Sequence, residues 1–203
     1  MASEKASATV PQARAPQQKR GRDRVAALTA AASELFVEKG FDATTMTEIA
    51  ARAGAAIGTL YLFFPTKQAI AQAILTQQAE ELSAQLDALR DRTRGMDAAA
   101  IADRLFSELG SFMAGHPAYS ALLDLPGDDG WRRAMRGRRR SQIAALFSAA
   151  EPPLPAGQAE RLAVIVPQLM RIPLALIGEK RLRDGILEEL RLMLGRHLQA
   201  GDR

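Results

Sequence analysis

Cysteine is absent from this sequence of 203 residues, and histidine occurs only twice. Without cysteine the chain has no disulfide, no thiolate nucleophile and no Cys-ligated zinc or iron–sulfur centre. His116 and His197 lie far apart in the chain, and the acids Asp124, Asp128 and Asp129 near His116 have no recognised metal-ligand or catalytic spacing. We therefore expect no metal, no other cofactor and no enzymatic activity.

Long apolar runs are missing as well. The richest apolar stretch, residues 162–177, is interrupted by Gln168, Arg171 and two prolines. A bilayer-spanning helix needs about 20 mostly apolar residues, so none is expected. The N-terminus has no apolar core of the kind found in a secretory signal, and we expect a cytoplasmic protein.

The positive charge is concentrated near the N-terminus. Residues 1–67 hold nine Lys and Arg against six Asp and Glu, which is +3 of the formal net charge of +4. Residues 1–18 have few large apolar side chains and are expected to form a disordered arm. The arm leads into a basic cluster, Lys19, Arg20, Arg22 and Arg24. This cluster favours a polyanionic partner, with a solubilising tail as the alternative.

The rest of the chain has the periodicity of helices. Apolar residues in 25–36 recur at spacings of three and four, and the pattern ends at Gly40, which can form a left-handed helix cap. Thr45 and Glu48 form a capping box, which predicts a short helix that ends at Gly54. Further helices are expected at 56–63, from Thr66 to about Gly95, and near 97–114, 118–124, 129–150, 157–179 and 183–198. The sequence thus predicts an all-α fold of about nine helices without a sheet.

Two short helices joined by Gly54-Ala55-Ala56 have the pattern of a helix–turn–helix. In such a motif the first helix braces the second, which lies in the major groove of DNA. The residues expected to face inward are Ile49, Ala50, Ala53, Leu60 and Phe64. The residues expected to face outward are Thr45, Thr47, Ile57, Gly58, Thr59 and Tyr61. The pattern alone is also that of an ordinary corner of a helical bundle, but the adjacent basic cluster favours DNA binding.

The residues around this motif are more specific. ELFVEKGFDATTMTEIA at positions 34–50 and GTLYLFFPTK at positions 58–67 resemble the N-terminal domain of the TetR (tetracycline repressor) family of bacterial regulators. The resemblance implies a DNA-binding domain at 19–67 and a helical effector-binding and dimerisation domain at 68–203. It implies DNA contacts by Thr45, Thr47, Thr59, Tyr61 and Lys67, the last to a phosphate. We also expect DNA contacts from Arg22, Arg24, Ile57 and Gly58.

Several positions depart from the usual pattern of that family. Ala56 stands where a serine commonly caps the recognition helix, and Ile57 stands where a lysine is frequent. Leu62 and Phe63 replace a frequent histidine and tyrosine. These changes remove a cap and polar groups that bind the DNA backbone. The alternative interpretation is therefore a helical interaction scaffold with a degenerate helix–turn–helix and weak or no specific DNA binding.

The stretch 162–177 is apolar around the whole circumference of its predicted helix, so every side of that helix must be covered. One side can face the chain's own core and the other a twofold-related copy, as the resemblance also implies; the central helix of a monomeric bundle is the alternative. Pro167 and Pro173 are expected to kink the helix. The residues expected at the dimer interface are Leu162, Ile165, Leu169, Ile172, Leu176, Ile186, Leu190, Met193 and Leu194.

Large apolar and aromatic side chains in the middle of the chain either fill the core or line a pocket. The resemblance implies an effector pocket here, and its side chains would favour a small hydrophobic or planar effector. The candidate pocket residues are Phe106, Phe112, Met113, His116, Tyr119, Trp131, Met135, Phe147, Met170 and Arg171. We interpret the six arginines within 132–140 mainly as a solvated face paired with nearby acids, with an acidic effector as the alternative.

These observations predict a homodimeric transcriptional regulator, a ligand-responsive repressor that binds a palindromic DNA operator. Its two recognition helices would read half-sites about one helical turn, 34–36 Å, apart. Effector binding would shift the long helix that begins at Thr66 and so change this spacing.

Overall fold

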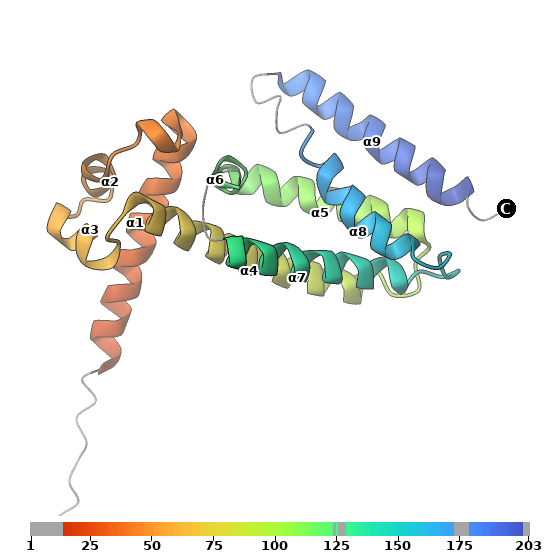
Figure 1. Ribbon diagram of the computed structural model, residues 1–203, viewed down its shortest axis with the longest axis horizontal. Helices are drawn as coiled ribbons and strands as arrows, with labels where there is room; N and C mark the ends of the chain where they lie inside the picture. The colour runs from red at the N-terminus through yellow and green to blue at the C-terminus, as the bar shows by residue number, and fades with distance from the viewer. Residues whose placement is uncertain (1–13, 124, 126–128, 173–178, 201–203) are drawn as a thin grey trace, which may run out of the picture. The chain divides into compact units, whose positions relative to one another are not determined.

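The computed structural model describes residues 14–123, 125, 129–172 and 179–200 (Figure 1). Within these ranges it contains nine α-helices and no strand, which confirms the predicted all-α fold. The helices are α1 Arg14–Ala43, α2 Met46–Arg52, α3 Ile57–Phe63, α4 Lys67–Arg92, α5 Ala98–Gly115, α6 Pro117–Leu122, α7 Asp129–Ser148, α8 Gln158–Leu169 and α9 Lys180–Ala200.

Two compact units make up the chain. Met1–Ala71 forms the first unit, with α1 to α3 and the start of α4, and Gln72–Arg203 forms the second. The division therefore falls within α4. The domain boundary expected after Lys67 stays a prediction.

The first helix begins earlier than the sequence pattern indicated. α1 starts at Arg14, and residues 1–13 lie outside the described part of the chain, so the disordered arm expected at residues 1–18 stays a prediction. Residues 14–18 are Arg, Ala, Pro, Gln and Gln. Proline is tolerated in the first turn of a helix, and Arg, Ala and Gln are good helix formers that extend a helix whose later turns are packed. Near the other end of α1, Gly40 has a φ of 85°, which glycine adopts without the penalty of a Cβ atom.

The two helices of the helix–turn–helix begin as local chemistry predicts. In the capping box before α2, Thr45 Oγ1 accepts the Glu48 N–H at 3.3 Å, and Glu48 Oε2 accepts the Thr45 N–H at 2.9 Å. Gly54, with φ 60°, makes the turn, and its N–H donates to the Ala51 carbonyl at 3.1 Å. Ala56 precedes α3 without a side-chain cap, as expected from its methyl group.

The core of the first unit forms where α1, α2, α3 and the start of α4 pack together. Ile49 and Leu60 are fully buried, which fixes the inner faces of α2 and α3. The predicted inward residues Ala50 and Phe64 are buried as well, and Ala53 is half-buried. α1 and α4 contribute Leu28, Ala32, Leu35, Phe36, Ile70 and Ala71 to the same core.

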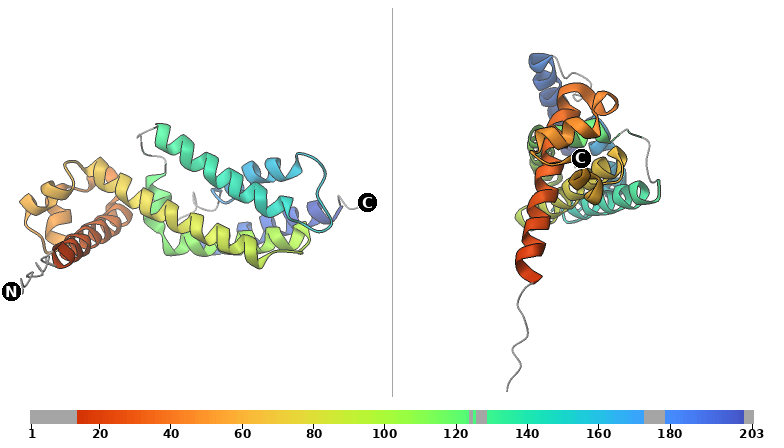
Figure 2. Two further views of the ribbon diagram at one scale, coloured as in Figure 1. Left: turned by 90° about the horizontal axis from the view of Figure 1, so that it is seen from below. Right: turned by 90° about the vertical axis from the view of Figure 1, so that its left-hand side faces the viewer.

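The second unit is a bundle in which α8 packs on α7 and α9 packs on α5 (Figures 1 and 2). Side-chain caps start two of the long helices: Thr66 Oγ1 accepts the Ala69 N–H at 3.1 Å at the start of α4, in the first unit, and Asp97 Oδ1 accepts the Ala100 N–H at 2.7 Å before α5, in the second. No helix in the described ranges is both long and apolar enough to cross a membrane.

The helix that holds Pro167 is shorter than predicted. α8 ends at Leu169, ten residues before the expected end near 179. A proline disfavours helical geometry in the residue before it, so Pro173 favours an end of the helix at this point. Pro173 and the rest of residues 173–178 lie outside the described part of the chain.

Candidate DNA-binding site and ligand cavity

The outer face of α3 presents apolar and aromatic side chains to solvent. Ile57 is 41% exposed, Tyr61 is 51% exposed and Leu62 is 80% exposed, whereas Leu60 on the inner face is fully buried. The other predicted contacts also reach the surface, with Thr45, Thr47 and Gly58 exposed and Thr59 half-buried. The two short helices therefore place these predicted DNA contacts on the surface of the first unit, as the pattern of inward and outward residues requires.

The recognition helix itself carries no charge, because its sequence is IGTLYLF. Positive charge in the first unit comes from α1, where Arg22 and Arg24 are exposed. Attraction to phosphates is supplied by such basic side chains, and apolar contacts can read the methyl group of thymine. The predicted DNA-binding site therefore has basic side chains on α1 and apolar side chains on α3.

Ion pairs hold α2 against α1. The Lys39 ammonium contacts the Glu48 carboxylate, and the Arg52 guanidinium donates to Glu38 at 2.9 Å and to Glu34 at 3.1 Å. The hydrogen bond from Lys39 lowers the pKa of Glu48 from its ordinary value of 4.5 to about 2, and the Arg52 hydrogen bond lowers the pKa of Glu38. These contacts bind α2, which supports α3, to the end of the long α1.

Sequence reasoning missed this set of ion pairs. Glu34 and Glu38 are four residues apart and so lie on one face of α1, which is a usable signal for a shared basic partner. The sequence does not show that Arg52 is this partner, because Arg52 lies on another helix, far from Glu34 and Glu38 in the chain.

Lys67 is already engaged within the first unit. Its ammonium donates to the carbonyls of Phe41 at 2.6 Å, Asp42 at 3.0 Å and Thr44 at 2.8 Å, and it lies 4.5 Å from the centre of the Phe41 ring. An ammonium has three N–H donors, and all three are used here. The expected contact of Lys67 with a DNA phosphate stays a prediction, but the structure assigns this side chain a role in positioning the fold.

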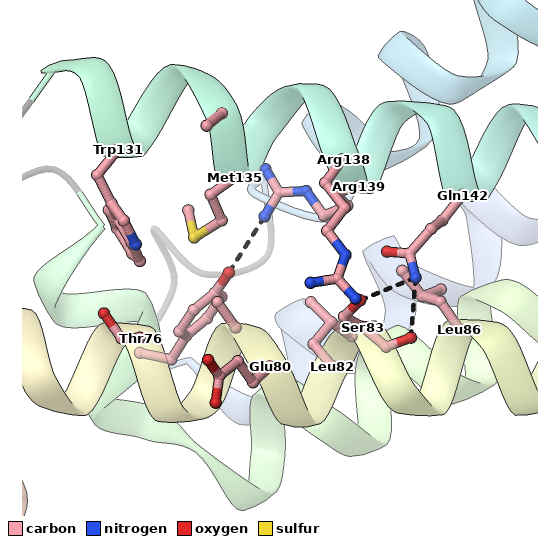
Figure 3. Close-up of a pocket in the computed structure, with 13 residues that line it drawn as sticks. Thr76, Glu80, Leu82, Ser83, Leu86, Trp131, Met135, Arg138, Arg139 and Gln142 are labelled. Atoms are coloured by element: carbon pink, nitrogen blue, oxygen red, sulfur yellow. Dashed lines mark hydrogen bonds between the residues drawn. The ribbon is translucent and has the colours of Figure 1, made fainter.

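A cavity of about 220 Å³ lies between α4 and α7 in the second unit. Figure 3 shows Trp131, Met135 and Arg138 pointing into it from α7, opposite Leu82 and Leu86 of α4. One end of the cavity is therefore aromatic and apolar, and the other end carries a cation.

The cavity walls are tied together by side-chain hydrogen bonds. Gln142 of α7 donates to the Ser83 hydroxyl of α4 at 2.8 Å and to the Ser83 carbonyl at 3.0 Å (Figure 3). Arg139 donates to the Tyr119 hydroxyl at 3.2 Å. Burial raises the pKa of the Tyr119 phenol, which therefore stays neutral at physiological pH and can accept this hydrogen bond.

A smaller cavity of about 80 Å³ adjoins the first one among α4, α5, α6, α7 and α8. Both cavities are lined by Tyr119 and Met135. Of the other predicted pocket residues, Trp131 lines the larger cavity, and the smaller one is lined by Phe112, Met113, Met170 and Arg171.

Three predicted pocket residues line neither of these two cavities. Phe106 and Phe147 are buried in the packed core of the second unit, where large apolar side chains most often lie. His116 stacks on the Phe112 ring at 4.2 Å, and its Nε2 atom is 3.3 Å from the Glu81 carboxylate. These three side chains are therefore engaged in packing and local contacts.

The interpretation of the arginine run as a solvated face is wrong for two of its members. Arg132 is only 8% exposed and donates to the Leu123 carbonyl, and Arg139 is half-buried against Tyr119. The reason is that these two positions lie on the inner face of α7. Arg136 and Arg138 also line the cavities but are exposed, as are Arg133 and Arg140.

The residues predicted at a dimer interface divide into two groups. Ile165, Ile172 and Met193 are exposed, the last at 62%, and Leu169, Ile186 and Leu190 are half-buried. Leu162 and Leu194 are instead buried in the core of their own chain, because they face α7 and α5 respectively within the bundle. Leu176 lies outside the described residues.

Replacing Lys67 with alanine should destabilise the first unit. The change removes three charge-assisted hydrogen bonds, and we expect the free energy of unfolding to fall by about 1–3 kcal/mol. Denaturant unfolding followed by circular dichroism measures the change, with the exposed neighbour Gln68→Ala as a control within about 0.5 kcal/mol of the parent. A K67A variant of unchanged stability that binds all DNA sequences more weakly would show that Lys67 acts mainly at a phosphate.

Acid should destabilise the first unit partly through Glu48. Because the pKa of Glu48 is lowered to about 2 in the folded state, its contribution to stability is complete above pH 4.5 and is lost as the pH falls towards 2. Thermal unfolding of Glu48→Gln should show lower stability at pH 7 and a shallower loss between pH 4.5 and pH 2.5 than the parent. An identical acid profile in the variant and the parent would contradict the role of the Lys39–Glu48 pair; Glu189→Gln, an exposed glutamate of α9, is the control.

Comparison with known proteins agrees with this geometry. Residues 28–74 match the sequence model of the family described as bacterial regulatory proteins, tetR family. No curated protein matches the chain. The matched segment runs from the buried part of α1 through the helix–turn–helix into α4.

Solved structures of similar fold cover most of the chain. A bacterial regulatory protein in the tetR family from Rhodococcus RHA1 has a TM-score of 0.68 at 19% identity, over 86% of this chain and 96% of that one. CprB from Streptomyces coelicolor, a TetR family protein solved with its biological operator sequence, has a TM-score of 0.63 at 24% identity, over 87% and 88%. FadR from Bacillus subtilis, a transcriptional regulator solved with stearoyl-CoA, has a TM-score of 0.62 at 15% identity, over 80% and 95%.

The family match and the structural likenesses concern the same arrangement of helices that the sequence predicted. The helix–turn–helix lies inside the matched segment, and the helical second unit is part of the shared fold. Residues 28–74 of this chain therefore match the tetR family of bacterial regulatory proteins, and the chain as a whole has the fold of the TetR-family regulators to which it was compared.

Proposed function

We propose that the protein is a homodimeric, ligand-responsive repressor that binds a palindromic operator through α3. The observation that carries this proposal is the exposure of Ile57 and Tyr61 on a short helix whose inner face is locked into the core by Leu60. A rigid helix with an exposed face of this kind can enter the major groove and contact base edges. CprB, which has the same fold, was solved with its operator, and this supports the proposal.

Exposed apolar side chains on the last two helices support a homodimer. Val164, Ile165 and Ile172 are exposed on or just after α8, and Leu182, Leu192 and Met193 are exposed on α9. Contiguous exposed apolar surface on a folded chain marks an interaction site, and a twofold-related copy covers such a surface with the same surface of its partner. Dimerisation would also present two α3 helices to the two halves of a palindrome.

The cavity in the second unit supports a response to a small ligand. α4 is one continuous helix that carries Lys67 in the first unit and the cavity-lining Leu82 and Leu86 in the second. A ligand that binds better to one position of α4 shifts the population toward that position, by at most its difference in affinity. Couplings of this kind are typically about 1–3 kcal/mol, enough to change the affinity for the operator by roughly 5–150-fold.

One observation favours the alternative of an interaction scaffold. α3 carries no basic residue, and Leu62 at 80% exposure is an apolar side chain on its surface. Such a helix could bind an apolar partner instead of DNA. The experiment on α3 below separates the two functions, since a scaffold would show no sequence-dependent DNA binding.

The double substitution Thr59→Ala and Tyr61→Ala should abolish specific DNA binding. Each base contact discriminates by about 1–3 kcal/mol, so specific affinity should fall at least tenfold, to about the level of nonspecific DNA. Fluorescence anisotropy at two salt concentrations measures the specific and the nonspecific affinity, with an operator that the parent chain selects from random DNA and with a scrambled duplex. The control is Val37→Ala, which truncates an exposed apolar residue on α1 and should leave specific binding unchanged. Equal operator affinity in the double variant and the parent would contradict the assignment of α3.

The substitution Ile165→Asp should convert the dimer to a monomer. A charge placed on an exposed apolar residue of α8 is desolvated in an apolar interface, and unpaired buried charges are strongly destabilising. Sedimentation should give about twice the chain mass of 21.9 kDa for the parent and the single mass for the variant. Val37→Asp, on α1 of the first unit, is the matched control and should remain dimeric. A parent chain that stays monomeric at every concentration would exclude the homodimer.

A further inference from the structure

The two cavities of the second unit share part of their lining. Leu82, Tyr119, Met135 and Arg139 line both of them. The hydrogen bond from Arg139 to the Tyr119 hydroxyl, drawn as a dashed line in Figure 3, lies at this partition. These four shared side chains form the boundary between the larger and the smaller cavity.

Cations surround the smaller cavity. Arg132, Arg136, Arg139 and Arg171 line it, and none of its described lining residues is an acid. In the larger cavity the described lining includes Arg138, Arg139 and a single acid, Glu80. The charge around the two cavities therefore has the sign that attracts an anion.

Arg132 carries the strongest part of this argument. It is 8% exposed, its Nη1 atom donates to the Leu123 carbonyl, and its Nε atom is buried without a hydrogen-bond partner. A buried guanidinium with an unpaired N–H is unfavourable, because its desolvation is only partly compensated. An incoming carboxylate compensates it well, since two oxygens match the planar fork of donors.

The remaining lining restricts the body of the ligand. Phe112, Met113, Met135 and Met170 make the wall beside the arginines apolar, and Trp131 closes part of the larger cavity. The larger cavity of about 220 Å³ exceeds the roughly 150 Å³ that accommodates a benzene molecule in a protein core. One aromatic ring with a short side chain fits this space.

We propose that the adjoining cavities bind a small carboxylic acid with an apolar, single-ring body. The carboxylate accepts hydrogen bonds from the Arg132 Nε atom and from Arg139, where it replaces the Tyr119 hydroxyl, and the ring lies against Met135 and Trp131. This inference rests on the proposed function, in which the second unit binds the effector, and it names the effector's chemical class.

Calorimetric titration of the full chain with 3-phenylpropionate tests the proposal. The matched neutral probe is 3-phenylpropanamide, which has the same body without the charge, and acetate is the head group without the body. We expect the acid to bind about tenfold or more tightly than the amide, because a bidentate charged pair is lost in the amide, and acetate to show no saturable binding at the same concentrations. An amide that binds as tightly as the acid, or a chain that binds neither, overturns the proposal.

Variants assign the binding to the arginines. Arg132→Gln and Arg139→Gln should each lower the affinity for the acid about tenfold or more and leave the amide unchanged. Arg140→Gln is the matched control, because Arg140 is exposed on the same helix and is not among the residues that line either cavity. If the buried Arg132 is needed for folding, the half-buried Arg139 still decides the outcome. Equal loss of affinity in Arg140→Gln would show nonspecific attraction by the basic helix and contradict the site.

Operator binding separates failure of this inference from failure of the proposed function. The affinity of the chain for its selected operator is measured with and without the acid. If the acid does not bind while operator binding remains specific, only the ligand class is wrong. If the acid binds with the expected selectivity but operator affinity does not change, the site stands and the ligand response is wrong.

Discussion

The first unit depends on the hydrogen bonds of the Lys67 ammonium, which join the start of α4 to the end of α1. This side chain contacts carbonyls of Phe41, Asp42 and Thr44 at the end of α1, while its own backbone begins α4. The whole helix–turn–helix lies between these two points in the chain, so one side chain fixes both of its ends. The ion pairs from Lys39 and Arg52 then hold α2 to α1. Because both ends of the helix–turn–helix and its helix α2 are held in place, α3 keeps its orientation while its outer face stays exposed.

In the proposed function, an uncharged helix takes part in the recognition of a polyanion. α3 contributes shape and apolar surface, and the basic residues of α1 contribute charge. Phosphate contacts supply affinity without sequence information, and base contacts supply the specificity. A chain in which the two roles lie on different helices depends strongly on the rigidity of the unit that joins them. The carbonyl contacts of Lys67 and the capping box of Thr45 supply that rigidity through local chemistry.

Local features of the fold were predictable from sequence, and long-range side-chain partners were not. The capping box, the turn at Gly54 and the missing cap at Ala56 each depend on residues a few positions apart, and the structure confirms all three. Ion pairs such as that between Arg52 and Glu34 depend on how the helices pack together, and the spacing of apolar residues does not predict this packing. The same reason explains the burial of Arg132: a dense basic run indicates a surface, and only the packing of α7 shows which arginines point inward. The sequence also predicted an apolar face on the last helix, but it could not show that Leu194 on this face is buried within the chain, where α9 packs on α5.

Selection of bound duplexes from a random DNA pool by the full chain tests the central claim most directly, because it assumes neither the operator nor the ligand. An outward-facing α3 presented twice by a dimer predicts enrichment of an inverted repeat whose half-site centres are about 34–36 Å apart. The Tyr61→Ala variant should lose that enrichment while retaining salt-sensitive binding to any sequence. A pool that stays random through repeated rounds with the parent chain would contradict the account.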